Sequence, residues 1–77
     1  MNLKMTISTA LGISIDRVTD DISVDTCPEW TSLEQIALIS ALESACATEF
    51  DIMESIEMDS YEGIKGVLEA RGIDIDD

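Results

Sequence analysis

The chain has 77 residues, of which 17 are Asp or Glu and only 4 are Lys or Arg, giving a formal net charge of −13. Nucleic acids and anionic membranes would repel such a chain, so we expect it to bind neither. The length allows one small domain, spanning residues 1–77, without room for a deep catalytic cleft.

Composition favours packed helices and argues against an enzyme. Hydrophobic residues make up 45% of the chain, yet it has one Trp, one Tyr and one Phe, so the core should be aliphatic. There is no His to serve as a base for a nucleophile, and the two cysteines lack zinc spacing. The acids between Asp16 and Asp25 lack the Gly and final Glu of a calcium loop. A solvated acidic surface is favoured there over weak cation binding, and no metal site is predicted.

No apolar run approaches the roughly 18 residues of a membrane span, and no signal-peptide core follows Met1. Two cysteines are too few for a disulfide framework. We therefore expect a reduced, cytoplasmic protein.

The first predicted helix runs from Asn2 to Leu11, where apolar residues recur every four positions, and Gly12 ends it. A long loop follows, from Gly12 to Trp30. Its isolated aliphatic side chains should pin it to the core, and a loop of this length is often functional.

The second predicted helix, Ser32 to Ala47, is the central packing element. Thr31 and Glu34 match a capping box, in which each side chain binds the other residue's backbone N–H. The apolar stripe expected to face the core consists of Leu33, Ile36, Leu38, Ile39, Leu42 and Cys46.

The C-terminal part is predicted to contain one short helical turn, Met53 to Glu57, and a last helix. That helix starts near Asp59 or Ser60 and ends at Gly72. Its expected buried residues are Tyr61, Ile64, Val67 and Leu68, and its internal glycines, Gly63 and Gly66, indicate tight packing against another backbone. The acidic tail, 73–77, should fray. The predicted fold is all-α, a small four-helix bundle of three main helices and one short helix, with a long first loop.

Ser32 is the first residue inside the second helix. Its hydroxyl would lie beside unpaired backbone N–H groups and the positive end of the helix dipole, a favourable place for a phosphate ester. The physical argument leaves a plainer alternative open, in which Ser32 is only part of the helix start.

A longer pattern surrounds this serine. It comprises Leu11, Gly12, Val18 and Thr19, then Trp30, Thr31, Ser32 and Leu33, then Ile36, Leu38, Ile39, Ala41, Leu42 and Glu43, with Phe50 and the helix of Tyr61 to Gly72 in register. The pattern resembles the acyl carrier protein family over nearly the whole chain.

The resemblance implies a 4′-phosphopantetheine arm on Ser32 whose thiol holds acyl groups as thioesters. It further implies a monomer without catalytic activity that is modified by a phosphopantetheinyl transferase. Acyl-loading, synthase or acyltransferase enzymes with basic patches would then be its partners.

Departures from the family pattern indicate a specialised, free-standing carrier rather than a housekeeping one, in a pathway of fatty acid, polyketide, or lipid or saccharide modification type. Thr31 replaces the usual Asp, which contacts the transferase. Cys46 replaces a Phe, leaving space for a neighbour or a bound chain. Ala37 stands where an acid is common. The partner interface implied by the resemblance comprises Trp30, Thr31, Leu33, Glu34, Ala37, Glu43 and Glu54.

Two alternatives to this function remain. One is an aminoacyl or peptidyl carrier, which the same arm would serve, and the other is an unmodified acidic helical adaptor. Among single residues, Trp30 either contacts a partner or the arm, or packs on the loop. Cys27 is expected to be an exposed but inert thiol, and Met53 and Met58 are expected to fill the core.

Overall fold

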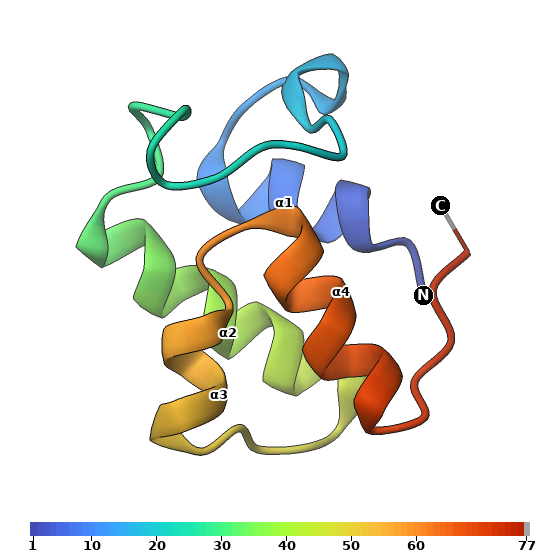
Figure 1. Ribbon diagram of the computed structural model, residues 1–77. Helices are drawn as coiled ribbons and strands as arrows, with labels where there is room; N and C mark the ends of the chain where they lie inside the picture. The colour runs from blue at the N-terminus through green and yellow to red at the C-terminus, as the bar shows by residue number, and fades with distance from the viewer. Residues whose placement is uncertain (77) are drawn as a thin grey trace.

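A computed structural model describes residues 1–76 as an all-helical protein (Figure 1). Its α-helices are α1 (Leu3–Leu11), α2 (Ser32–Cys46), α3 (Ile52–Glu57) and α4 (Tyr61–Ala70), with a short 3₁₀ helix, η1 (Ile15–Arg17), after α1. No strand occurs among the described residues. The predicted bundle of three main helices and one short helix is confirmed.

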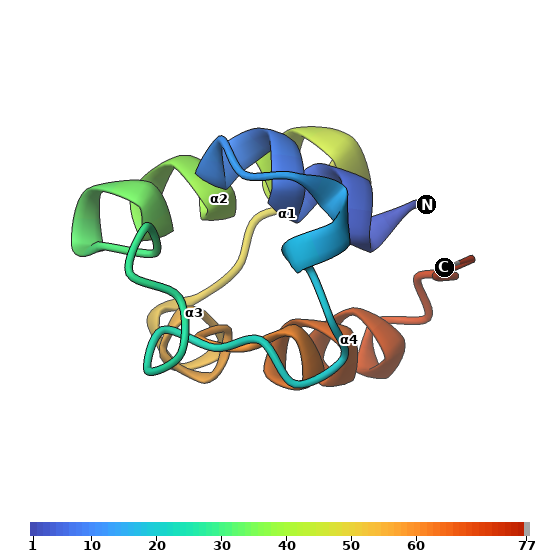
Figure 2. The ribbon, with the colours of Figure 1, turned by 90° about the horizontal axis from the view of Figure 1, so that it is seen from above.

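The helices form two layers (Figure 2). α1 packs along α2 in one layer, and α3 and α4 form the other. The long loop after α1 crosses from the first layer to the second and returns to begin α2. Two backbone hydrogen bonds attach it to the start of α4, from the Val24 N–H to the Asp59 carbonyl and from the Tyr61 N–H to the Ile22 carbonyl, each 3.0 Å.

Side chains at the N-cap positions set where the helices begin. Ser60 caps α4, and Gly12 ends α1 with a left-handed φ of 68°. The Thr31 hydroxyl accepts the Glu34 N–H at 3.4 Å, but the return contact of the predicted capping box is missing from the described hydrogen bonds. The complete box lies instead at the start of α3, between Asp51 and Glu54.

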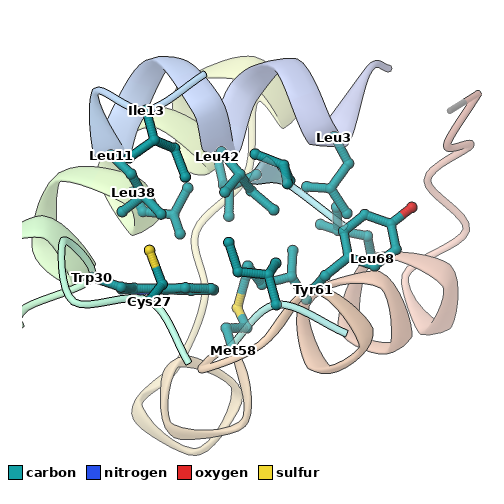
Figure 3. Close-up of a cluster of buried hydrophobic side chains, with 14 of the residues drawn as sticks. Leu3, Leu11, Ile13, Cys27, Trp30, Leu38, Leu42, Met58, Tyr61 and Leu68 are labelled. Atoms are coloured by element: carbon teal, nitrogen blue, oxygen red, sulfur yellow. The ribbon is translucent and has the colours of Figure 1, made fainter. Parts of the chain in front are cut away.

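The core lies between the two layers (Figure 3). Its fully buried large side chains are Leu3, Ile7, Leu38, Leu42, Met58, Ile64 and Leu68. Ile13, Val18 and Ile22 of the long loop are also buried, as predicted, whereas its other aliphatic residues, Ile15 and Val24, are exposed. Trp30 and Cys27 close one edge of the core. The expected exposure of Cys27 was therefore wrong, because this loop residue is only 2% exposed and belongs to the core cluster.

The predicted stripe of α2 was only partly correct. Leu38 and Leu42 are buried against α1, whereas Leu33 and Ile36 are 71% and 69% exposed. Apolar residues are spread around the whole circumference of α2, so periodicity alone does not select the buried face.

The C-terminal tail is docked over residues 73–76, contrary to the prediction that it frays; Asp77 lies outside the described residues. Ile73 and Ile75 pack against the core, and the Asp76 N–H donates to the Met1 carbonyl at 3.0 Å. The Met1 thioether lies 3.8 Å from the Cys46 thiol, so this neighbour occupies space beside Cys46.

The two glycines within α4 differ in their surroundings. A Cβ on Gly63 would lie 2.1 Å from the Glu57 carbonyl oxygen, so this glycine does permit a close backbone approach between α3 and α4. A Cβ on Gly66 would have no neighbour within 4 Å, and the predicted tight packing there was wrong.

Candidate functional site

Ser32 begins α2, and its side chain is exposed. The Thr31 hydroxyl accepts one N–H of the first turn, but no described residue hydrogen-bonds the Ser32 hydroxyl. The other N–H groups of this turn and the helix dipole give the site a positive character without a basic side chain. A hydroxyl in this setting is free to form an ester, and the helix start would favour a phosphate there.

A groove of about 790 Å³ runs between α2 and α3, with Ser32 at one end. At the Ser32 end, the start of α2 contacts the residue that follows α3 through a hydrogen bond from Gln35 to the Met58 carbonyl. At the other end, the Glu43 carboxylate accepts the Phe50 N–H at 2.9 Å. The walls between the ends are largely aliphatic and are formed by Ile36, Ile39, Ile52 and Ile56.

Five large apolar side chains are exposed on the outer surface of these two helices. They are Leu33, Ile36, Ile52, Met53 and Ile56, between 64% and 78% exposed, and we call them the α2–α3 apolar face. Met53 was expected to fill the core and does not, because α3 buries none of its residues. Met58, just after α3, is fully buried as expected.

Each of the four basic side chains is engaged with an acid or lies near an aromatic ring. Lys4, Arg17 and Arg71 form ion pairs with Asp20, Glu29 and Glu54, and the Lys65 ammonium lies 6.0 Å from the Tyr61 ring centroid. Among the described residues, no basic side chain lines the groove. Three acids lie beside the α2–α3 apolar face or the groove, namely Glu34, Glu57 and Asp59. None of them takes part in an ion pair among the described residues. The region around Ser32 is therefore apolar with an acidic border.

The residues of the interface implied by the resemblance have different environments. Thr31, Leu33 and Ala37 are exposed near Ser32, and Glu34 is half-buried beside them. Trp30 is only 4% exposed and packs into the core edge, so it presents little surface to a partner. Glu43 and Glu54 are both engaged in hydrogen bonds, the first to Phe50 and the second to Arg71.

Gln35, which the sequence analysis missed, connects three segments of the site. Its side-chain oxygen accepts the Trp30 indole N–H at 2.6 Å, and its side-chain nitrogen donates to the Met58 carbonyl at 2.9 Å. Glutamine is common on exposed helix surfaces, so nothing in its sequence position signals this role.

Arg71, at the end of α4, binds α3 through Glu54. Its guanidinium donates to both carboxylate oxygens of Glu54 at 2.5 and 2.7 Å and to the Thr48 hydroxyl at 2.8 Å, and lies 5.0 Å from the Phe50 ring centroid. Hydrogen bonds from Arg71, and from the Asp51 N–H, lower the pKa of Glu54 from 4.5 to about 2. The carboxylate therefore stays charged well into the acid range.

Replacing Arg71 with Gln is expected to lower the melting temperature at neutral pH. The difference in melting temperature between the variant and wild type should become smaller as the pH is lowered. Because the Glu54 pKa is lower in the folded state, the pair stabilises the fold above pH 4.5, and this contribution disappears as the pH falls through about 2. Thermal melts between pH 7 and 2 measure this difference. Glu69→Gln is the control and should show no such narrowing; a constant Arg71→Gln difference down to pH 2 would contradict the prediction.

The described residues contain no group of three His, Cys, Asp or Glu side chains placed to hold a metal ion. Within residues 1–76, no helix is long and apolar enough to cross a membrane. A scan against models of protein families finds no match to the chain, and no curated protein matches it significantly.

Proposed function

We propose that this protein is an acyl carrier, with a 4′-phosphopantetheine arm on Ser32. The observation that carries the proposal is that an exposed, unpartnered serine hydroxyl at a helix start lies at the end of an aliphatic groove. The bound arm supplies a thiol on which an acyl group is held as a thioester. The chain contributes the attachment hydroxyl, the positive helix start for the phosphate, and the groove.

The groove suits a hydrocarbon chain in polarity and in length. Ser32 and Glu43 lie eleven residues apart on α2, which corresponds to about 16 Å along a helix. Burying each methylene against the isoleucine walls is worth about 0.8 kcal/mol. This favours acyl groups with an aliphatic tail over aminoacyl or peptidyl groups, whose amides would find few partners along the walls.

The partners in this proposal are a phosphopantetheinyl transferase and acyl-loading, synthase or acyltransferase enzymes. The α2–α3 apolar face adjoins Ser32, so an enzyme that reaches the arm would also contact this face. The acids bordering it favour partners with basic patches and accelerate their association. Ala37 in place of an acid and an apolar rather than acidic α2 support a specialised carrier for one pathway. The two free cysteines are compatible with a cytoplasmic carrier.

Mass spectrometry after coexpression with a phosphopantetheinyl transferase tests the proposal. The expected result is a single added phosphopantetheine, located on the peptide that contains Ser32. Ser32→Ala should abolish the modification. Ser40→Ala is the matched control, because Ser40 is exposed and lines the same groove but lies inside α2. Thr31→Asp should raise the yield with a general-purpose transferase, since it restores the acid typical of the family.

The absence of the added mass with several transferases, in wild type and in Thr31→Asp, would overturn the carrier proposal. The α2–α3 apolar face favours one other candidate, an unmodified adaptor that binds a partner through this surface. Partner binding by such an adaptor would be the same for wild type and Ser32→Ala. A carrier instead loses acyl transfer completely in Ser32→Ala.

A further inference from the structure

The side chain of Gln35, one helical turn beyond Ser32, is held on two sides by buried residues. Its oxygen accepts the Trp30 indole N–H at 2.6 Å, and its NH₂ group donates to the Met58 carbonyl at 2.9 Å. Trp30 is only 4% exposed and Met58 is fully buried. An indole N–H can only donate and a carbonyl can only accept, so the orientation of the amide is determined. Gln35 thus connects the end of the long loop, the first turn of α2 and the residue after α3.

The other hydrogen bonds at the start of α2 are local. The Trp30 N–H donates to the Cys27 carbonyl at 3.0 Å, and the Gln35 N–H donates to the Thr31 carbonyl at 2.9 Å. The Thr31 hydroxyl accepts the Glu34 N–H at 3.4 Å, which is long for a helix cap. These bonds join near neighbours along the chain. Among the hydrogen bonds within residues 1–76, only those of the Gln35 side chain connect the start of α2 to the layer formed by α3 and α4.

Loss of the Gln35 amide would leave the Trp30 indole N–H without its partner. A buried donor without an acceptor is unfavourable, so the indole would turn towards water. Trp30 stands two residues before Ser32, so the backbone at the start of α2 would move with it. Ser32 would then lose its fixed position relative to α3 and to the α2–α3 apolar face.

We propose that Gln35 is a positioning residue for Ser32, which fixes the first turn of α2 against the other layer and holds the Ser32 hydroxyl at a constant place beside the α2–α3 apolar face. An enzyme that docks on this face and reaches Ser32 needs both in one arrangement. The apparent affinity of that enzyme falls in proportion to the fraction of molecules in the competent arrangement. The effect on modification rests on the proposed function, whereas the ordering of the helix start does not.

Backbone ¹⁵N relaxation of the unmodified protein tests the ordering directly. Gln35→Met removes both contacts, and Met is close to Gln in volume and in helix propensity. In this variant the order parameters of the Thr31 and Ser32 amides should fall from about 0.85 to below about 0.6. The indole N–H of Trp30, the only Trp of the chain, should exchange faster with water. Ser40→Ala, a substitution of an exposed residue further along α2, is the control and should leave these signals unchanged.

Gln35→Glu separates the two contacts, because it keeps an acceptor for the Trp30 indole but loses the donor to the Met58 carbonyl. Its order parameters at Thr31 and Ser32 should lie between those of wild type and Gln35→Met. Steady-state modification by a phosphopantetheinyl transferase supplies a second measurement. The KM for Gln35→Met should rise about three- to tenfold with kcat nearly unchanged, because only the fraction of correctly arranged molecules changes. Thermal melts confirm that both variants are folded.

Order parameters at Thr31 and Ser32 that stay at the wild-type value in a folded Gln35→Met would overturn the positioning role. So would a loss confined to kcat, because that result would place Gln35 in the transfer step rather than in the presentation of Ser32. The relaxation measurements use unmodified protein. A protein that no transferase modifies would therefore refute the carrier proposal, while the order parameters would still decide whether Gln35 positions Ser32.

Discussion

Replacing Gly63 with Ala is expected to destabilise the protein by about 3 kcal/mol. The added Cβ would lie 2.1 Å from the Glu57 carbonyl oxygen, and a backbone atom cannot move aside as a flexible side chain can. The junction of α3 and α4 would have to separate. A domain of this size has a total stability of about 4–11 kcal/mol, so the loss is a large share of it.

Gly66→Ala is the matched control for this substitution, because both glycines lie within α4 but a Cβ on Gly66 meets open space. The alanine should stabilise the helix by up to about 1 kcal/mol through its better helix propensity. Urea unfolding of the two variants and wild type measures both effects. Similar stabilities for the two variants would show that the close approach at Gly63 does not constrain the fold.

Under the proposed carrier function, removing the centre of the α2–α3 apolar face is expected to weaken docking of a loading enzyme by about ten- to a hundredfold. In the double variant Ile36→Gln, Ile52→Gln, two side chains that are 69% and 78% exposed lose their apolar surface. The few residues that cost more than about 1 kcal/mol each when truncated cluster near the centre of an interface. Glu34→Gln should reduce affinity much less, since exposed charges on a rim act mainly on association rate.

The affinity of such an enzyme for this protein, or its kcat/KM with this protein as substrate, measures the effect at two salt concentrations. The control is Met5→Gln, Ile15→Gln, which removes two exposed apolar side chains outside the face. Docking should tolerate added salt better than a purely ionic interface would. Equal losses in the double variant and its control would rule out the face as the docking surface.

The ends of the helices could be predicted from the sequence because local signals determine them. Gly12 ends α1 with a positive φ, Ser60 caps α4, and Thr31 caps α2, each through contacts within a few residues. The exposure of Ser32 follows from the same local geometry. These contacts do not depend on how the helices pack together.

The groove and the hydrogen bonds of Gln35 depend on packing, which the sequence pattern does not determine. Leu33 and Ile36 belong to the same apolar pattern as Leu38, and only the position of α1 decides which of them are buried. Gln35 meets Met58 across 23 positions of the chain, a pairing with no local signal. Cys27 likewise becomes buried only because the long loop folds back over the core.

The absence of buried residues in α3 also has a kinetic consequence. A helix that adds little to the core can dock after the transition state for folding, once α1, α2 and α4 have come together. A substitution that weakens the helix itself, such as Ile56→Gly, should then raise the unfolding rate and leave the folding rate nearly unaltered. The amide hydrogens of α3 should also exchange through local opening, well below the free energy of global unfolding. The segment that forms one wall of the groove would thus move without unfolding the rest of the protein.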